Sequence, residues 1–129
     1  MSLKILIAED EPAIALSIEF LLRKDGFATR VAADGEAALR IAADFVPDLL
    51  VVDLMLPQVS GLEVCRRLRL DTRLPSLKIL MLTARGSAGD FSRSQAVGVD
   101  GYQVKPFSTQ ELVKEVRRLL SIDKLNYVH

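Results

Sequence analysis

Several features that would direct a protein to a membrane, to the cell exterior or to a polyanionic partner are missing from this 129-residue chain. Its single cysteine, Cys65, cannot form an intramolecular disulfide, and no apolar run reaches membrane-spanning length. The N-terminus lacks the long uncharged segment of a secretory signal. Seventeen basic and seventeen acidic side chains cancel, so no global field favours nucleic acid or an anionic membrane. We therefore expect a cytoplasmic protein whose partners are selected by a local site.

Glycine-rich phosphate-binding loops are also missing. Neither G-x-x-x-x-G-K-[ST] nor G-x-G-x-x-G occurs in the sequence, which argues against binding of ATP or a dinucleotide at a glycine-rich turn. Half of the residues are apolar. A chain of this size can bury about two-thirds of the surface that it exposes when unfolded. One compact domain is therefore expected.

Two kinds of segment alternate along the chain. Short apolar runs rich in branched residues predict strands, and they lie at residues 4–8, 28–31, 49–52, 78–82 and 101–104. The segments that follow them have helical periodicity, as in Ile14, Ile18 and Leu22, so we expect five strand–helix units. The fourth helix, within residues 87–97, is rich in glycine and serine and has a thin apolar face. We expect a mobile segment there.

Residues typical of helix ends agree with this division. Pro12 suits the first turn of a helix, and Gly26 occurs where a helix should end. The spacing of a capping box occurs twice, at Ser60 with Glu63 and at Ser108 with Glu111.

Alternating strands and helices with short connections predict an α/β fold, a three-layer sandwich in which helices cover both faces of a parallel sheet. The continuously apolar runs at 49–52 and 79–82 are typical of central strands, whereas 28–31 alternates in polarity and is typical of an edge. Helical periodicity ends near residue 121. We therefore expect one domain over residues 4–121, and a C-terminal tail or the start of a linker over residues 122–129.

The residues directly after the predicted strands carry the unusual chemistry. Ligands of open parallel sheets bind beyond the carboxyl ends of the strands. The residues at those positions are Glu9, Asp10 and Glu11 after the first strand, Asp53 after the third, Thr83 after the fourth, and Lys105 and Pro106 after the fifth.

Glu9, Asp10 and Asp53 are expected to form an acidic pocket. Carboxylates from adjacent strands repel one another unless a cation lies among them, and Mg²⁺ suits a site with few protein ligands and several waters. Asp10 or Glu11 taken alone fits a helix N-cap better than a metal ligand. Asp53 does not fit that alternative, because its helix is not expected to begin until about Ser60.

Thr83 and Lys105 are each unremarkable alone, as a strand threonine and a surface lysine. Placed beside Asp53 and Mg²⁺, they supply what phosphoryl transfer to a carboxylate needs. The aspartate is a nucleophile, while the metal, the lysine and a hydroxyl stabilise the developing charge. The proline after Lys105 can adopt a cis bond that orients the lysine. These residues predict formation of an aspartyl phosphate, with the phosphate arriving on another carrier.

Five short motifs occur in order along the chain: Glu9-Asp10-Glu11, Asp53 in DLMLP, Gly61 in SGLEV, Thr83-Ala84 in MLTAR, and Lys105-Pro106-Phe107 in GYQVKPF. In this combination, the chain from about residue 4 to residue 120 resembles the chemotaxis-regulator-like receiver domain of bacterial two-component response regulators. The resemblance implies the flavodoxin-like strand order 2-1-3-4-5, with five flanking helices.

The resemblance also implies a mechanism. Asp53 would accept a phosphoryl group from the phosphohistidine of a sensor histidine kinase or a histidine phosphotransfer protein. Mg²⁺ would be held by Glu9 or its water, by Asp10 and Asp53, and by the backbone carbonyl of Met55. Lys105 would pair with a phosphoryl oxygen. Apart from its own phosphorylation and dephosphorylation, the domain would catalyse no reaction.

The resemblance further implies a switch. The Thr83 hydroxyl would turn toward the phosphate and vacate space for Tyr102, which would repack the face formed by the fourth helix, the fifth strand and the fifth helix. That face would control an output domain or a downstream protein, with no direct contact to nucleic acid or membrane. The domain would be a monomer or a phosphorylation-dependent dimer. Many relatives carry acidic residues where Ala96 and Gly101 stand, so these two positions count against one style of dimer.

Two other functions remain open. A Mg²⁺-dependent phosphohydrolase also uses an aspartyl phosphate, but such enzymes usually have a second aspartate two residues after the nucleophile, where this chain has Met55. A binding module that keeps the fold without phosphorylation is the other alternative, and the intact Asp53, Thr83 and Lys105 argue against it. A free-standing switch and a part of a longer regulator fit equally well.

Other notable residues receive ordinary interpretations. Cys65 is expected to fill the core. The cluster Arg66, Arg67, Arg69 and Arg73 is expected to form a solvated face, with a basic docking patch as the alternative. No role is expected for His129.

Overall fold

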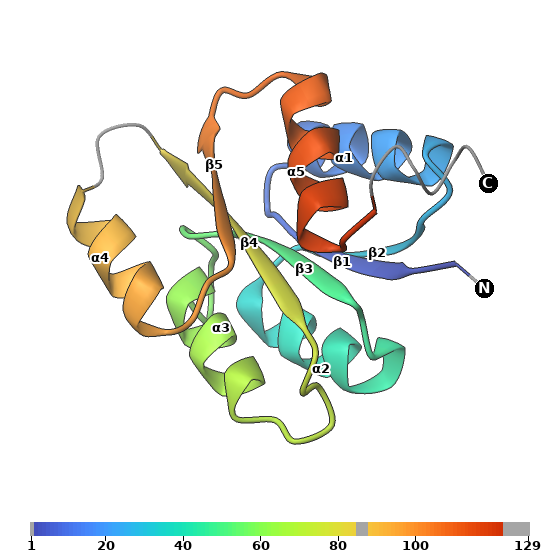
Figure 1. Cartoon of the computed structure of the whole chain (residues 1–129). Helices are drawn as coiled ribbons and strands as arrows, with labels where there is room; N and C mark the ends of the chain where they lie inside the picture. Colours follow the sequence, from blue (N-terminus) through green and yellow to red (C-terminus); the bar gives the residue numbers. More distant parts are fainter. Residues whose placement is uncertain (1, 85–87, 123–129) are drawn as a thin grey trace.

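Five parallel strands form the centre of the molecule in a computed structural model that describes residues 2–84 and 88–122 (Figure 1). The strands are β1 (Lys4–Ala8), β2 (Ala28–Ala32), β3 (Leu49–Asp53), β4 (Lys78–Ala84) and β5 (Gly101–Lys105). Their order in the sheet is β2-β1-β3-β4-β5, which confirms both the expected order and the edge position of β2.

Five helices complete the three layers, and their number and positions confirm the predicted fold class. They are α1 (Pro12–Lys24), α2 (Gly35–Phe45), α3 (Gly61–Arg69), α4 (Ala88–Ala96) and α5 (Thr109–Leu119). Figure 1 shows α1 and α5 together on one side of the sheet, and α2 and α3 on the other. In the described part of the chain, no helix combines the length and apolarity needed to cross a membrane.

The central strands are buried on both faces. Alternate residues of β1, β3 and β4 point to opposite sides of the sheet. One set packs with α1 and α5 and includes Ile5, Ile7, Leu49, Val51, Leu80 and Leu82. The other set packs with α2 and α3 and includes Leu6, Ala8, Leu50, Val52, Ile79 and Met81. Each large apolar side chain buried in this way contributes about 1.5–3 kcal/mol to folding, so the sheet holds its position firmly.

Three strands extend further than the loss of apolar residues suggests. Asp53 still pairs with Leu82, and Thr83 and Ala84 still pair with β5. The predicted ends at residues 52, 82 and 104 were therefore too early, because backbone pairing continues after the side chains become polar. Asp53 and Lys105 therefore end their strands and Thr83 lies within β4, whereas Glu9 and Asp10 follow β1 as expected.

The helix ends show which local signals are sufficient. Pro12 begins α1, Gly26 follows its end with φ +96°, and Ser108 and Glu111 complete a capping box at α5. The other predicted capping box, at Ser60 and Glu63, was wrong in part. Ser60 does accept a hydrogen bond from the Glu63 N–H, but the Glu63 carboxylate binds Arg66 and Arg67. Those two guanidinium groups lower the pKa of Glu63 to about 2.

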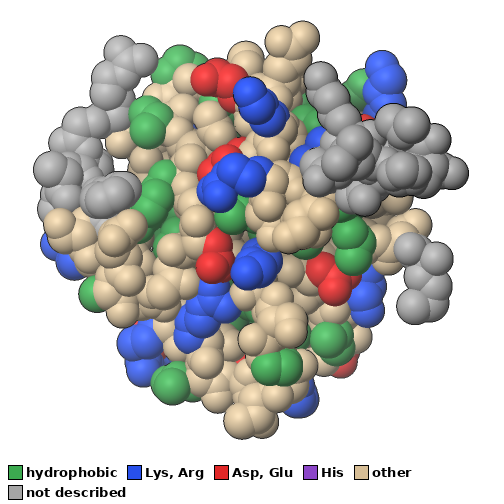
Figure 2. Space-filling view, viewed as in Figure 1, with side chains coloured by type: hydrophobic (Ala, Val, Ile, Leu, Met, Phe, Trp, Pro, Cys, Tyr) green, Lys and Arg blue, Asp and Glu red, His purple; other side chains and the backbone are tan. Residues whose placement is uncertain are grey.

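The interpretation of the arginine cluster needs one correction. Arg66, Arg67 and Arg73 are exposed, with 50 to 64% of their side chains accessible, as expected of a solvated face. Arg69 is only 26% exposed and bonds to residues far away in the sequence. Across the face seen in Figure 2, basic and acidic side chains lie side by side.

Two expectations about mobile or terminal segments are not tested. The fourth helix lies within the predicted range, but Gly86 and Ser87 fall outside the described residues, and the expected mobility stays a prediction. Residues 123–129 also fall outside them, so the expected tail or linker stays a prediction too.

Cys65 projects from α3 into the hydrophobic core, as expected, and its burial leads to a test. It is fully buried, and burial raises the pKa of its thiol to about 12. At about pH 8 we therefore expect the folded protein to react with Ellman's reagent at least a hundredfold more slowly than the urea-unfolded protein. The control is Ser92→Cys in a Cys65→Ser background, because position 92 is exposed on α4. Fast labelling of folded Cys65 would contradict this packing.

Candidate active site

The sheet brings most of the predicted site residues together at the carboxyl ends of its strands. Glu9 and Asp10 follow β1, Asp53 ends β3, and Lys105 ends β5. Oxygen atoms of Glu9, Asp10 and Asp53 lie within 4.8 Å of one another. The acidic pocket expected from the sequence is therefore present in the geometry.

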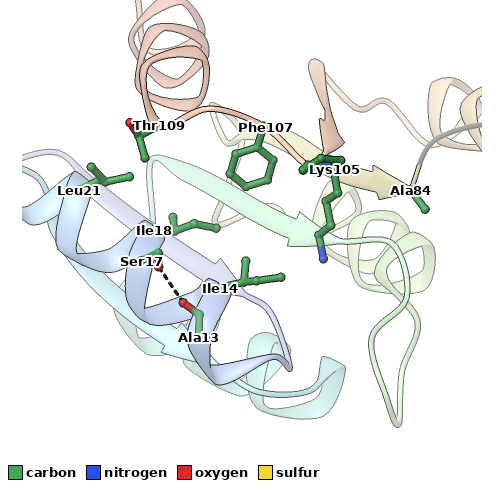
Figure 3. Close-up of a pocket in the computed structure, with 10 residues that line it drawn as sticks. Ala13, Ile14, Ser17, Ile18, Leu21, Ala84, Lys105, Phe107 and Thr109 are labelled. Carbon is green, nitrogen blue, oxygen red and sulfur yellow. Dashed lines mark hydrogen bonds between the residues drawn. The ribbon is translucent and has the colours of Figure 1, made fainter.

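Lys105 connects the two buried carboxylates. Its Nζ atom donates to Glu9 Oε1 at 2.8 Å and to Asp53 Oδ2 at 3.0 Å. Because β4 lies between β3 and β5, the lysine must extend past the end of β4, and Figure 3 shows it pointing toward the end of β3. The Lys105–Pro106 peptide bond is cis.

The Asp53 carboxylate is held from two sides. Its Oδ1 atom accepts the Met55 N–H at 3.0 Å, while Oδ2 accepts from Lys105. Gly61 lets the start of α3 approach this point, since a Cβ on it would lie 2.3 Å from the Asp53 carbonyl oxygen. The sequence marked Gly61 as part of a motif but gave no reason for it, and this close approach supplies one.

Burial and hydrogen bonding have opposite effects on the pKa values of the pocket residues. Glu9 is almost fully buried, and this burial, together with repulsion from Asp53, raises its pKa. The hydrogen bonds from Lys105 and from the Glu11 N–H oppose that rise. For Lys105 the balance is reversed. Burial alone would lower its pKa, but hydrogen bonds to Glu9 and Asp53 raise it.

The donor set fits a divalent cation. It consists of three carboxylates, of which Glu9 and Asp53 are buried while Asp10 faces solvent. Hard oxygen donors with an open side are what Mg²⁺ requires, because the ion keeps several of its waters. No contact in the structure tests the Met55 carbonyl as a further ligand, and that role stays a prediction.

Thr83 and Tyr102 lie on the same face of the sheet. Tyr102 pairs with Met81 and Thr83 pairs with Val104, so alternation places both side chains on the side of Met81. Thr83 is buried. Tyr102 packs against the core cluster of that side and hydrogen-bonds to Ser94 and Gln95 of α4, while partial burial raises its pKa. Tyr102 therefore links β5 to α4.

An apolar groove beside the pocket was missed by the sequence reasoning. It has a volume of about 550 Å³ and lies between α1 and the segment that connects β5 to α5 (Figure 3). Ile14, Leu21 and Phe107 line it, and Lys105 lies at its edge. The sequence signal that a partner could cover this helix was an apolar residue on the side of α1 that faces solvent. Phe20 and Leu16, which lie on the same helix but do not line the groove, are 67% and 63% exposed.

Comparison with known proteins identifies the family of this chain. Residues 5–117 match the family model of the response regulator receiver domain. The chain belongs to this family. Receiver domains are the phosphorylation-dependent switches of two-component signalling, and they bind Mg²⁺ in an acidic active site.

Curated relatives extend the comparison to full-length proteins. The phosphate regulon transcriptional regulatory protein PhoB of Rhizobium meliloti is 44% identical over 117 residues, which cover 91% of this chain and 52% of that protein. The DNA-binding response regulator MtrA of Mycolicibacterium smegmatis is 42% identical over 120 residues, which cover 93% and 51%. The chain thus spans about half the length of the curated relatives it matches.

Solved receiver structures agree in fold. The chemotaxis response regulator CheY4 of Vibrio cholerae superposes with a TM-score of 0.87 at 30% identity, covering 92% of this chain and 99% of that chain. The receiver domain of the sensor histidine kinase PA1611 of Pseudomonas aeruginosa PAO1 gives a TM-score of 0.85 at 30% identity, covering 94% and 99%. A magnesium ion is coordinated in the active site cleft of that domain.

The lysine of this receiver domain allows a test of the charge balance. Lys105→Met removes the cationic partner of Glu9 and Asp53, and we expect the free energy of unfolding to fall by about 1–3 kcal/mol near pH 8, since Lys105 is partly exposed. The loss should be smaller near pH 5. The pKa of Glu9 is already raised, so in the variant the folded protein takes up a proton there as the pH falls, which removes the repulsion.

Urea unfolding followed by circular dichroism at both pH values measures this difference, without added Mg²⁺. Lys114→Met is the matched control, because Lys114 is exposed on α5. An equal loss at the two pH values would show that Lys105 does not balance the buried carboxylates.

Proposed function

We propose that Asp53 is the phosphoacceptor of this receiver domain and that it takes its phosphoryl group from the phosphohistidine of a sensor histidine kinase or a histidine phosphotransfer protein. One observation carries the proposal. The Asp53 carboxylate ends a buried strand, accepts a hydrogen bond from Lys105, and shares a pocket with Glu9 and Asp10.

The chemistry follows from these contacts. A carboxylate oxygen of Asp53 attacks phosphorus, the bond from phosphorus to the imidazole nitrogen breaks, and the imidazole leaves. Lys105 is placed to stabilise the negative charge that develops on a phosphoryl oxygen. Mg²⁺, held by Glu9, Asp10, Asp53 and the Met55 carbonyl, would supply further positive charge to those oxygens. The Met55 N–H orients the attacking carboxylate.

The response is proposed to pass through Thr83 and Tyr102. Thr83 is buried on the same face of the sheet as Tyr102, on the neighbouring strand. A turn of the Thr83 hydroxyl toward a new phosphoryl group would change the space available to Tyr102, and Tyr102 already bonds to α4. The face formed by α4, β5 and α5 is then the output surface.

A phosphohydrolase is a weaker alternative. Position 55 would have to supply an acid, and its side chain is an exposed methionine. We therefore propose that the domain catalyses only its own phosphorylation and dephosphorylation. The proposed setting is the cytoplasm, the proposed domain spans residues 4–121, and an attached output domain or a separate protein reads the output surface. The oligomeric state is proposed to be a monomer or a phosphorylation-dependent dimer, with no direct contact to nucleic acid or membrane.

The apolar groove gives the phosphodonor a place to dock. It runs between α1 and Phe107 and reaches Lys105, whose Nζ atom contacts Asp53 (Figure 3). A donor protein that covers the groove would bring its phosphohistidine near the acceptor. The Ser17 hydroxyl bonds to the Ala13 carbonyl within α1, so this wall can be covered without leaving that hydroxyl unpaired.

Phosphorylation of Asp53 can be measured by intact-mass spectrometry after incubation with acetyl phosphate and Mg²⁺. The wild type should gain one phosphoryl group, and Asp53→Asn should gain none. Chelation of Mg²⁺ should abolish the reaction, and Asp10→Asn should slow it by about tenfold or more. The control is Asp44→Asn, an exposed acid on α2 that should react like the wild type. A phosphoryl group on Asp53→Asn at the wild-type rate would refute the assignment.

The docking groove can be tested separately from the chemistry. Phe20→Ser should slow transfer from an autophosphorylated histidine kinase by about tenfold or more, because Phe20 is exposed on α1, the helix that forms one wall of the groove, and an exposed aromatic side chain often dominates an interface. The rate with acetyl phosphate should stay within about twofold of the wild type, since that donor needs no protein surface. Leu70→Ser is the control, because Leu70 is equally exposed but follows α3. Equal effects of both variants would place the docking surface elsewhere.

A further inference from the structure

The side chain of Arg69 connects the end of α3 to the loop between α4 and β5 through hydrogen bonds. The Arg69 guanidinium donates to the Gly98 carbonyl through Nε at 2.9 Å and through one terminal nitrogen at 2.7 Å. It also donates to the Leu77 carbonyl and to the Asp100 carboxylate. Three segments that are distant in sequence therefore meet on a single arginine.

Asp100 extends this connection into the sheet. Its Oδ2 atom accepts both from Arg69 and from the Ile79 N–H, at 2.8 Å in the second case. Its own N–H donates to the Ile79 carbonyl at 2.9 Å. The start of β5 is thus tied to the start of β4 at the same point where Arg69 binds.

Gly98 connects the same point to the end of α4. It has φ +86°, and its N–H bonds to the Gln95 carbonyl while the Val99 N–H bonds to the Ser94 carbonyl. This pattern closes the C-terminus of a helix. Arg69 Nε lies 3.4 Å from the place that a Cβ on Gly98 would occupy, so the arginine packs on the glycine as well as bonding to it.

Apolar packing holds α4 only weakly in the part where its side chains are described. Among residues 92–96, Ser94 is the one buried residue. By contrast, α5 buries Leu112, Val116 and Leu119. In this described part, polar contacts therefore contribute to the orientation of α4: Tyr102 bonds to Ser94 and Gln95, and Arg69 bonds to the Gly98 carbonyl directly beyond the C-terminal end.

The two ends of α4 lie at opposite ends of the strands: the helix follows the carboxyl end of β4 and precedes the amino end of β5. Its N-terminal end follows β4, which carries Thr83, and the helix then runs back toward the end of α3 (Figure 1). A short rigid helix that is fixed at one end can respond at the other end only by rotating about the fixed end. The end nearer Asp53 is the one without the Arg69 contacts.

We infer that Arg69 is the pivot of the switch: it holds the C-terminal end of α4 in place, so that phosphorylation of Asp53 rotates the helix about Gly98. This inference rests on the proposed function in one respect, the response of α4 to Asp53. Arg69 is a positioning residue. It touches no atom of the acidic pocket and acts through Gly98 and Asp100.

Backbone amide NMR of the whole chain, with and without beryllofluoride and Mg²⁺, tests the pivot. In the wild type, the shift changes in this region should fall on residues 88–97 and be small at Gly98 and Asp100. In Arg69→Met they should extend through Gly98 and Asp100. Hydrogen exchange at residues 97–100 should also become about tenfold faster or more, because bonds to a charged donor are lost. Arg67→Met is the matched control, since Arg67 lies on α3 but the partner that the structure gives its side chain is Glu63.

The outcomes separate a pivot from a purely structural role. If Arg69→Met only lowers stability, its beryllofluoride shifts will keep the wild-type pattern, and the inference fails. It also fails if Gly98 and Asp100 of the wild type shift as much as α4. Arg69→Lys keeps the charge without the planar fork and provides a folded variant if methionine is too disruptive. If beryllofluoride changes nothing in the wild type, the proposed function fails, while the exchange comparison still decides whether Arg69 fixes the end of α4.

Discussion

A carboxylate at the end of a strand that is buried on both faces is the constraint on which the rest of the structure depends. All five residues of β3 are buried, and Asp53 is the last of them. An isolated charge in that position would be costly, so the surrounding chain must compensate it. The compensation comes from the nearby Met55 N–H and from Lys105 at the end of β5, which is distant in the sequence. The fold therefore has to place β5 correctly for β3 to end in an aspartate.

This arrangement ties chemistry to the sheet edge and response to the helices. The pocket carboxylates are held rigidly because β1 and β3 are almost fully buried, whereas α4 is held by little apolar surface in its described half. A change of charge at Asp53 would therefore act between the buried strands, which resist movement, and α4, which can adjust its position. Tyr102 spans the two, since it belongs to β5 and bonds to α4. A switch needs such an element, with two arrangements that differ little in energy.

The sequence predicts those features that follow from periodicity and from the topology of parallel sheets. Apolar runs located every strand, and the rule that functional residues gather at strand ends brought Asp53 and Lys105 together before any distance was known. The exact strand ends were missed, because backbone pairing does not stop where side chains become polar. Glu63 has the spacing of a capping box, but two arginines on the next turn compete for its carboxylate. Arg69 looked like its exposed neighbours, because its acceptors are the carbonyls of Leu77 and Gly98, and carbonyl positions leave no trace in a sequence.

The charge of the pocket explains why a lysine and a divalent cation are both needed. When Glu9, Asp10 and Asp53 are ionised, Lys105 neutralises only one of the three, and the raised pKa of Glu9 shows that repulsion and burial remain. A phosphoryl group adds further negative charge at the same place. Mg²⁺ would offset the excess before the transfer, and Lys105 would be free to turn from the carboxylate to a phosphoryl oxygen as the charge grows. In the proposed function, transfer would then replace one set of ion pairs with another without exposing the end of β3, and the energy of the new charge would go into Thr83, Tyr102 and α4 rather than into opening the core.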